Sequence, residues 1–382
     1  MLPDHVLKNF THNQENEIFV LKFHPTEQIL LSGDVTGSIH FNLFDVDSQS
    51  VSIPEGMGSK PFRPHRGDSS TTCRSVDLVE SSGGYDIVSG GSDGRVVVSN
   101  FDPKITGKWK VADVPINVVV AVSENLVVAG DDDGALHAID LRERKKIFSV
   151  HEQSDYISAI TSSLSGNPLK SILAVSGDCT LAAYDFRGTA KDRLVAMSDE
   201  QEEELNCVAV INAEQHVVTG DAHGVVGVWK QGFWGDLKDR LPLYMKGESV
   251  GADGAHSIDG LKVVGKDKFI TATSDGIIRM CNLFPNRVDR IIGVHQGEDD
   301  KEIATISGFD CDVDMGLIAS ACGDAAGTIK FWSLNKNQKS EDIEDGSAEV
   351  VQKKGSKKKR KTKETVVSNP EKAKRQSFFS DL

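Results

Sequence analysis

The chain has 382 residues, of which 38% are hydrophobic and 26% charged, and its formal net charge at pH 7 is −14. No apolar run approaches the roughly 18 residues that a membrane helix needs, and the first ten residues lack the basic and apolar regions of a secretory signal. The six scattered cysteines form no CxxC pair, so we expect reduced thiols in an intracellular protein rather than disulfides or a metal site.

The first predicted element is a strand–turn–strand unit at residues 30–41, LLSGDVTGSIHF. Apolar runs flank the turn, and Asp-Gly between such runs indicates a β-hairpin, because glycine accepts the positive φ that a tight turn requires. The same unit returns at residues 87–98, 127–138, 172–183, 217–228, 269–280 and 320–331. A phosphate-binding glycine loop would occur once, so this repetition indicates architecture.

The spacing of the seven turns predicts a β-propeller. The last turn positions, at intervals of 57, 40, 45, 45, 52 and 51 residues, are Gly37, Gly94, Gly134, Cys179, Gly224, Gly276 and Gly327. Units of roughly 40–50 residues with several short strands and no helical pattern are typical of propeller blades. We therefore predict an all-β, seven-bladed propeller over residues 1–335, with a different turn expected at Cys179.

The two ends of this region predict how the ring closes. Residues 328–334 (TIKFWSL) supply one strand after the last turn, and the chain then becomes polar. Residues 5–12 (HVLKNFTH) precede the first inner strand, which is predicted at residues 17–23. Because an open ring would leave strand edges unpaired, we expect the N-terminal strand to complete the seventh blade.

The units resemble WD repeats, although none contains a literal Trp-Asp pair. That position reads Asn42-Leu43, Ser99-Asn100, Ile139-Asp140, Tyr184-Asp185, Trp229-Lys230, Cys281-Asn282 and Trp332-Ser333. The usual Gly-His pair is reduced to a histidine, at His12, His65, His151 and His295. We expect these histidines to hold blade strands together by hydrogen bonds rather than to bind a ligand.

Three further segments resemble one family of WD-repeat proteins. They are residues 23–41 (FHPTEQILLSGDVTGSIHF), residues 229–244 (WKQGFWGDLKDRLPLY) and residues 376–382 (QSFFSDL). Together they are similar to the eukaryotic nucleolar family called WD repeat-containing protein 55, over essentially the whole chain. The resemblance implies a scaffold in ribosomal RNA processing and large-subunit assembly, located in the nucleus and nucleolus. Its implied partners are ribosome-assembly proteins and pre-ribosomal particles.

Residues 336–382 are predicted to form a disordered, lysine-rich tail. They contain 13 Lys and Arg against eight Asp and Glu, whereas residues 1–335 contain 30 basic and 49 acidic residues. This polar stretch cannot bury enough apolar surface to fold alone. Its basic run indicates a nuclear import signal, a non-specific RNA contact or both, against the alternative of a solvating tail. The run consists of Lys353, Lys354, Lys357, Lys358, Lys359, Arg360, Lys361 and Lys363.

The tail ends with two adjacent aromatic residues, Phe378 and Phe379. We expect them to dock in a groove of a protein partner, and the alternative is an incidental terminus. The acidic propeller is not expected to bind RNA broadly, because phosphate contacts need positive charge. Its acidic runs at residues 199–204 and 297–302 either attract basic ribosomal proteins or solvate the surface.

Two consecutive blades carry similar tetrapeptides, IDLR at residues 139–142 and YDFR at residues 184–187. Each resembles the Trp-Asp-x-Arg box of propellers that serve as substrate receptors for cullin-type ubiquitin ligases, with Ile or Tyr in place of Trp. In those propellers the box arginine helps dock the damaged-DNA-binding adaptor. The alternative is an arginine that hydrogen-bonds nearby loop carbonyls. The box residues are Asp140, Arg142, Asp185 and Arg187.

No set of residues indicates catalysis. The chain contains neither a GxxxxGK[ST] phosphate loop nor an HExxH metal motif, and the acidic residues 131–133 match the turn position of other units. We therefore predict a monomeric, non-catalytic scaffold without cofactor or metal, and without membrane contact. A ubiquitin-ligase substrate receptor is the alternative, and an enzyme is a distant third, since the fold itself says nothing about chemistry.

Overall fold

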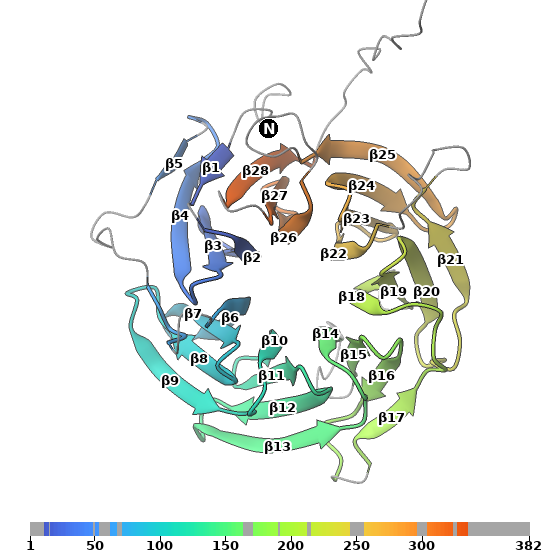
Figure 1. Cartoon of the computed structure of the whole chain (residues 1–382), viewed down its shortest axis with the longest axis horizontal. Coiled ribbons are helices and arrows are strands. Elements are labelled where there is room, and N and C mark those ends of the chain that lie inside the picture. Colours follow the sequence, from blue (N-terminus) through green and yellow to red (C-terminus); the bar gives the residue numbers. More distant parts are fainter. Residues whose placement is uncertain are drawn as a thin grey trace, which may run out of the picture. The chain divides into compact units, whose positions relative to one another are not determined.

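Every regular element in the described part of the chain is a β-strand (Figure 1). The computed structural model describes residues 11–14, 16–48, 50–52, 62–66, 71–162, 171–189, 192–211, 215–244, 256–295, 304–323 and 327–334. The strands form seven four-stranded antiparallel sheets, arranged as blades around a central axis. The predicted all-β, seven-bladed propeller is thereby confirmed. Among the described residues, no helix could span a bilayer.

The first three blades each contain four strands that follow one another in sequence. Blade 1 contains β2 (Ile18–Phe23), β3 (Ile29–Asp34), β4 (Ile39–Asp45) and β5 (Ser50–Ser52). Blade 2 contains β6 (Cys73–Ser81), β7 (Gly84–Gly91), β8 (Arg95–Ser99) and β9 (Ile105–Lys110). Blade 3 contains β10 (Ile116–Ser123), β11 (Leu126–Asp131), β12 (Ala135–Asp140) and β13 (Lys145–His151).

Blades 4 to 6 repeat this order, and only blade 7 departs from it. Blade 4 contains β14 (Ile157–Ser162), β15 (Ile172–Ser176), β16 (Leu181–Tyr184) and β17 (Leu194–Met197). Blade 5 contains β18 (Leu205–Ile211), β19 (His216–Asp221), β20 (Val225–Lys230) and β21 (Asp239–Pro242). Blade 6 contains β22 (Ile258–Val263), β23 (Lys268–Thr273), β24 (Ile277–Asn282) and β25 (Arg287–Val294). Blade 7 contains β26 (Ile306–Asp312), β27 (Leu317–Cys322), β28 (Thr328–Ser333) and β1 (Thr11–Asn13).

The ring closes through the N-terminal strand, as predicted. Strand β1 pairs antiparallel with β28, so that Thr11 lies opposite Lys330 and Asn13 lies opposite Thr328. The backbone N–H of Gln14 extends the pairing by donating to the carbonyl of Gly327 at 3.3 Å. One end of the described chain thereby supplies the outer strand that the other end lacks, which removes an open edge from blade 7.

Neighbouring blades pack face to face through apolar side chains. At the closing seam, Ile18 and Phe44 of blade 1 form one buried cluster with Leu317 and Phe331 of blade 7. The rings of Phe44 and Phe331 lie 5.6 Å apart between centroids. The second strand of each blade is buried on both faces, and every residue of β11 is buried. This burial explains why the second strands read as nearly continuous apolar runs instead of alternating.

All seven hairpin turns use the same left-handed backbone conformation. The six turn glycines have φ between 56° and 87°. Cys179 has φ 66°, so the prediction of a different turn in blade 4 is wrong. Its N–H donates to the carbonyl of Ser176, as Gly134 N–H does to Asp131 in blade 3. The surrounding hydrogen bonds hold Cys179 in this conformation, at a cost of about 1–2 kcal/mol for a side chain with a Cβ.

The strand directions define two faces of the propeller. We call upper face the end that carries the seven hairpin turns at Gly37, Gly94, Gly134, Cys179, Gly224, Gly276 and Gly327. We call lower face the opposite end, which carries the connections that follow β4, β8, β12, β16, β20 and β24. Because the sheets are antiparallel, the turns between the first and second strands of each blade also lie on the lower face.

Ion pairs link the inner strands on both sides of the closing seam. Lys262 of blade 6 binds Asp310 of blade 7 at 2.8 Å, and Lys22 of blade 1 binds Asp77 of blade 2 at 2.7 Å. The second oxygen of Asp310 accepts the backbone N–H of Phe23 at 2.8 Å. The Asp77 charge is the largest cause of a raised Lys22 pKa, which burial alone would lower. These contacts form a continuous polar chain from blade 6 to blade 2.

Candidate protein-binding face

The lower face carries the two predicted Asp-x-Arg turns in neighbouring blades. Asp140 ends β12 in blade 3, and Asp185 directly follows β16 in blade 4. The Oδ1 atom of Asp140 accepts the backbone N–H of Arg142 at 2.8 Å. In the same way, Asp185 Oδ1 accepts the backbone N–H of Arg187 at 3.0 Å. The two turns therefore have the same local geometry and present their arginines at equivalent positions.

The two arginines differ in how firmly their own aspartates hold them. Arg142 Nη2 lies 3.2 Å from Asp140 Oδ2, and the Arg142 side chain is 70% exposed. Arg187 is bidentate, with Nε 2.9 Å from Asp185 Oδ1 and Nη2 2.6 Å from Oδ2, and its side chain is 45% exposed. More of the Arg142 guanidinium is consequently open to a partner, whereas the Arg187 guanidinium is fixed in one orientation.

Hydrogen bonds within these turns shift the pKa values of their charged side chains. The backbone N–H of Glu143 donates to Asp140 at 3.0 Å and is the largest cause of a lowered Asp140 pKa, to which Arg142 adds. The Asp185 carboxylate raises the pKa of the Arg187 guanidinium. Both pairs lie at the solvent, where such pairs add little stability.

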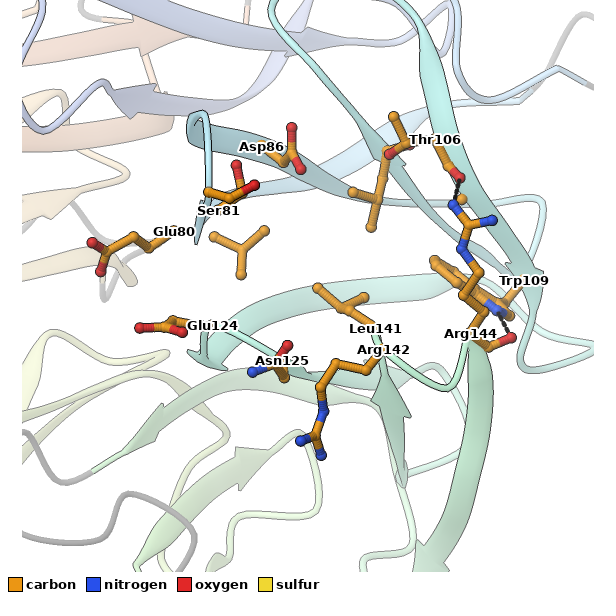
Figure 2. Close-up of a pocket in the computed structure, with 14 residues that line it drawn as sticks. Glu80, Ser81, Asp86, Thr106, Trp109, Glu124, Asn125, Leu141, Arg142 and Arg144 are labelled. Carbon is orange, nitrogen blue, oxygen red and sulfur yellow. Dashed lines mark hydrogen bonds between the residues drawn. The ribbon is translucent and has the colours of Figure 1, made fainter.

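A pocket of about 570 Å³ adjoins Arg142 between blades 2 and 3 (Figure 2). Glu80, Asp86 and Glu124 line it on one side, and burial is the largest cause of a raised Asp86 pKa. Arg144 lines the other side, where its Nη2 donates to the carbonyl of Thr106 at 3.1 Å. The pocket combines carboxylates, two arginines and apolar walls, which suits the side chains of a protein segment.

The acidic turn at residues 131–133 and the described cysteines form no metal site. Within the described ranges, no three His, Cys, Asp or Glu side chains are grouped so that they could hold a metal ion. Asp131, the first of three consecutive acidic residues, accepts the backbone N–H groups of Asp133 and Ala135 and so closes a turn. The described cysteines are free thiols, and Cys73, Cys207, Cys281 and Cys322 are buried.

Two tryptophans at the Trp-Asp position hydrogen-bond between strands of their own blade. Trp229 Nε1 donates to Thr219 Oγ1 at 3.0 Å, and Trp332 Nε1 donates to Ser320 Oγ at 2.8 Å. Both acceptors stand in the second strand of the same blade. Each contact joins the third strand to the second, which explains why this position favours a large side chain with one donor.

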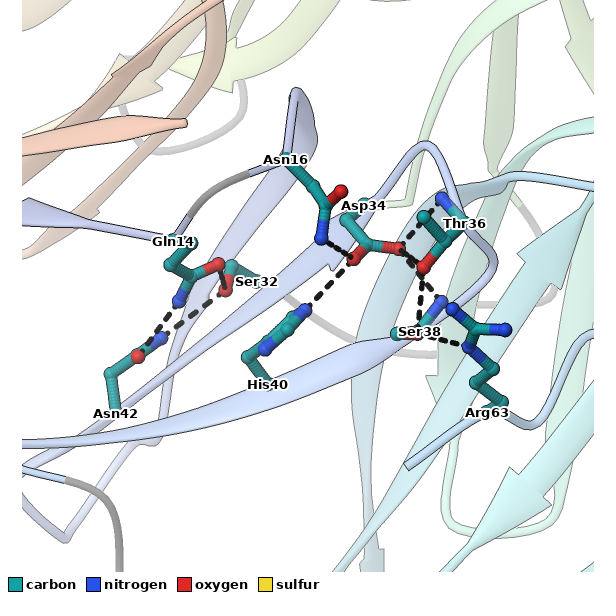
Figure 3. Close-up of polar contacts among 9 residues, drawn as sticks. All are labelled: Gln14, Asn16, Ser32, Asp34, Thr36, Ser38, His40, Asn42 and Arg63. Atoms are coloured by element: carbon teal, nitrogen blue, oxygen red, sulfur yellow. Dashed lines mark hydrogen bonds and ion pairs between the residues drawn. The ribbon is translucent and has the colours of Figure 1, made fainter. Parts of the chain in front are cut away.

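In blade 1 an asparagine makes the contact that tryptophan makes elsewhere (Figure 3). Asn42 Nδ2 donates to Ser32 Oγ at 3.2 Å, and Ser32 Oγ in turn donates to Gln14 Oε1 at 2.8 Å. Gln14 Nε2 closes the set by donating to Asn42 Oδ1 at 2.8 Å. No sequence pattern indicates Gln14, because it matches neither half of a Gly-His pair.

Two of the four histidines bond as predicted. His65 binds Ser89 Oγ and Asp93 Oδ1, each at 2.9 Å, and His295 binds Ser320 Oγ at 2.8 Å. His151 instead lies exposed at the end of β13. The spacing that singled it out therefore does not place it inside a blade, and the buried Gln153 two residues later bonds Thr180 instead. His12 lies in β1, where only the backbone is described.

The other predicted site residues lie outside the described residues. They are Phe378 and Phe379, together with the basic run Lys353, Lys354, Lys357, Lys358, Lys359, Arg360, Lys361 and Lys363. The predicted boundary between propeller and tail at residue 335 also falls there. The roles assigned to these residues stay predictions.

Comparison with known proteins supports the resemblance seen in the sequence. No family model matches the chain. WD repeat-containing protein 55 of Rattus norvegicus is 29% identical over 319 residues, covering 83% of this chain and 74% of that protein. The protein of the same name from Arabidopsis thaliana is 24% identical over 332 residues, covering 86% and 84%. An uncharacterized WD repeat-containing protein of Schizosaccharomyces pombe is 29% identical over 334 residues, covering 85% and 83%. The chain is thus a WD-repeat propeller homologous to proteins named WD repeat-containing protein 55.

Proposed function

We propose that this WD-repeat propeller is a non-catalytic nucleolar scaffold in ribosome biogenesis, where it supports ribosomal RNA processing and large-subunit assembly. The observation that carries the proposal is homology to proteins named WD repeat-containing protein 55 along most of the chain. The described surface fits a scaffold because its blades present many exposed turns on a rigid ring. The proposed partners are ribosome-assembly proteins within pre-ribosomal particles.

The charge distribution supports protein partners for the propeller and a nucleic-acid contact for the tail. Residues 1–335 carry 30 basic and 49 acidic residues, so the ring repels a polyanion and attracts basic proteins. Residues 353–363 contain eight basic residues in eleven, without interleaved aromatics. Lysine ammonium groups are point charges, so this run would contact RNA without sequence preference and with strong salt dependence. It would also serve as the nuclear import signal.

Partner identification with and without residues 336–382 tests this function. The tagged full chain should recover ribosome-assembly proteins, and the truncated chain should lose those that depend on nuclear entry. Replacing Lys357, Lys358, Lys359, Arg360 and Lys361 with Gln should move the folded protein to the cytoplasm. A matched control replaces five other basic residues of the tail, Lys336, Lys339, Lys372, Lys374 and Arg375. Unchanged nucleolar localisation of the first variant would contradict the import role.

The aromatic pair at the end of the tail has a separate proposed role in partner binding. Replacing Phe378 and Phe379 with Ala should leave the protein nuclear but weaken the capture of one protein partner. An apolar anchor contributes by burial in a groove, so this loss should persist at high salt, whereas lysine-dependent contacts should not. Retention of every partner by the Ala variant at both salt concentrations would refute the role.

The second candidate function is docking to the adaptor of a cullin-type ubiquitin ligase. The observation that favours it is the pair of equivalent, exposed arginines, Arg142 and Arg187, on one face of blades 3 and 4. Replacing both with Ala should abolish co-purification of the adaptor while the ring stays folded. The matched control is Arg287→Ala, because Arg287 also pairs with an aspartate two residues away, Asp289, outside the boxes. If the wild-type chain never captures the adaptor, this function is wrong.

A further inference from the structure

One aspartate position recurs at the end of the second strand in three blades. Asp34, Asp131 and Asp221 each stand three residues before the turn glycine of their blade. In each case Oδ1 accepts the backbone N–H groups two and four residues later, at 2.8 to 3.1 Å. The turn therefore holds all three carboxylates in the same way and directs the second oxygen, Oδ2, to the same place in each blade.

The second oxygen binds a histidine ring in blades 1 and 3. His40 Nε2 lies 2.9 Å from Asp34 Oδ2 (Figure 3), and His137 Nε2 lies 2.9 Å from Asp131 Oδ2. Both histidines stand three residues after the turn glycine. Blade 6 has Arg279 at this position, and its Nη1 donates to Thr273 Oγ1 at 2.7 Å, where Thr273 replaces the aspartate. A basic side chain thus fills the same space in three blades.

Blade 5 keeps the aspartate but has Gly227 at the position of the basic residue. A pocket of about 180 Å³ lies there, and both Asp221 and Gly227 line it. The two basic residues that also line it pair with acidic residues of the same lining: His223 with Glu203 at 2.6 Å and Arg240 with Glu202 at 3.0 Å. Among the described residues, no side chain hydrogen-bonds Asp221 Oδ2.

The pKa values of the three aspartates reflect this difference. In blades 1 and 3, burial acts to raise the pKa of Asp34 and Asp131, but hydrogen bonds from His40, His137 and the turn hold both below the usual value. In blade 5, burial raises the pKa of Asp221, and the turn N–H groups do not offset it. The Asp221 carboxylate therefore lacks the compensation that its two counterparts have.

The remaining walls of the pocket suit a long basic side chain. Leu237 and Thr219 supply the wall beside Gly227, since Leu237 Cδ2 and Thr219 Oγ1 would each lie 2.7 Å from a Cβ added to that glycine. Methylene groups of lysine or arginine commonly pack on such a surface while the charged head reaches a carboxylate. Glu203 lines the same pocket and binds His223 through Oε2, so a guanidinium at Asp221 would lie beside a second carboxylate, whose other oxygen is bound by no side chain in the described part of the chain.

We propose that this blade 5 pocket on the upper face binds an arginine side chain of a partner protein, whose guanidinium pairs with Asp221 as His40 and His137 pair with the aspartates of their own blades. Arginine is favoured over lysine because its planar fork binds two acceptors at once. The site lies on the opposite face from Arg142 and Arg187. The inference rests on the proposed function only in taking the ligand to be a protein segment.

Methyl NMR on the purified full chain tests this site without any cellular partner. The probe is the peptide acetyl-Gly-Arg-Gly-amide, titrated while the methyl signals of Leu237 and Val225, which line the pocket, are followed. The matched probe has citrulline in place of arginine and so keeps the shape without the charge. We expect saturable shifts with the arginine peptide and none with the citrulline peptide.

Two substitutions and one control locate the effect. Asp221→Asn keeps the Oδ1 acceptor of the turn but removes the charge, and should weaken binding at least about tenfold. Gly227→His introduces the ring found in blades 1 and 3 and should abolish the shifts. Because Leu237 crowds that position, the double variant Gly227→His with Leu237→Ala is prepared as well, and is followed through Val225. Glu200→Gln removes an exposed carboxylate of the neighbouring loop and should change affinity by no more than about twofold.

Three results would overturn the proposal. Equal shifts with the arginine and citrulline peptides would show that charge is irrelevant. An equal loss in Glu200→Gln and Asp221→Asn would show that the acidic surface attracts the peptide without a defined pocket. Absence of any shift at the highest soluble peptide concentration would show that no arginine site exists. None of these results bears on nucleolar localisation or on pre-ribosomal partners, so failure here is distinct from failure of the proposed function.

Discussion

The inner strands beside the closing seam and the lower-face turns of blades 3 and 4 both carry ion pairs, but these pairs differ in reach and burial. Asp310 joins three blades, because it binds Lys262 of blade 6 and the backbone of Phe23 in blade 1 from its place in blade 7. The Asp185 carboxylate, by contrast, binds the backbone and guanidinium of Arg187 within its own turn.

The difference teaches which charged residues hold the ring and which are available to partners. A buried carboxylate that joins separate blades cannot be removed without leaving its cationic partners uncompensated. An exposed pair within one turn competes with water and contributes little to folding. Residue type alone does not separate the two groups, since both consist of aspartates beside lysines or arginines.

Deleting residues 1–13 tests the seam most severely, and we expect the largest loss of stability. The deletion removes β1 and leaves β28 with an unpaired edge, so the protein should aggregate or unfold at a much lower temperature. Differential scanning calorimetry and light scattering measure both effects. Adding a synthetic peptide of residues 5–16 in excess should restore part of the melting temperature. An unchanged melting temperature after deletion would contradict closure by β1.

Removing Asp310, the buried carboxylate that joins blades 6, 7 and 1, should have the next largest effect on stability. Asp310→Ala leaves Lys262 without its partner and the N–H of Phe23 without its acceptor, and should lower the free energy of unfolding by about 3–5 kcal/mol. Asp289→Ala is the control, because it breaks only an exposed pair with Arg287 and should cost at most about 1 kcal/mol. Equal losses in urea denaturation would remove the distinction between the two groups.

The turn aspartates of blades 3 and 5, Asp131 and Asp221, should make stability depend on pH in opposite ways. The lowered pKa of Asp131 means that its contribution is present above the unfolded-state value near 3.9 and is lost as pH falls through the folded-state pKa. The raised pKa of Asp221 has the opposite sign, so its ionisation costs stability as pH rises above that value.

Asparagine substitutions at these two aspartates should therefore differ in sign at neutral pH. Asp131→Asn should destabilise by about 1–3 kcal/mol, because a buried hydrogen bond to a charged group is weakened. Asp221→Asn should be neutral or slightly stabilising in the free protein. Urea denaturation at several pH values between 4 and 8 measures both, and destabilisation by Asp221→Asn at pH 7 would show that this carboxylate is already compensated.

The lower-face arginines should give the smallest effect on folding. Arg142→Ala and Arg187→Ala, alone or together, should leave the melting temperature within about 2 °C of wild type, because both side chains lie at the surface. Circular dichroism on heating measures this. A larger fall would place these arginines among the residues that hold the ring, and would weaken their assignment to partner binding.

The propeller could be predicted from the sequence because its units are local. A hairpin is specified by two apolar runs and a turn residue that accepts positive φ, and all of these lie within about 12 residues. Cys179 shows the limit of this argument. The turn in blade 4 follows the others although its residue has a Cβ, because neighbouring hydrogen bonds determine its conformation. The position of the Asp-x-Arg boxes was equally local, since each follows a third strand.

The polar contacts between blades could not be predicted, because the residues that form them are distant in sequence. Asp310 and Phe23 are 287 positions apart, and no periodicity within one unit indicates that they meet. Gln14 likewise bonds Ser32 and Asn42 in a role that a motif search assigns to histidine. Such partners are identified by geometry, since any side chain of suitable length and polarity can fill the position.

The sequence by itself determined the seven hairpins, their number and order, and the use of the N-terminal strand to close the ring, because strand pattern and turn chemistry act over a few residues. Only the tertiary structure decided which charged side chains are paired within the fold and which stay available at the surface. Gly227 in the printed sequence is one more small residue in a strand. The pairing of β20 with β19 places it opposite Thr219, and it lines a pocket together with Asp221, the counterpart of the aspartates that His40 and His137 bind elsewhere.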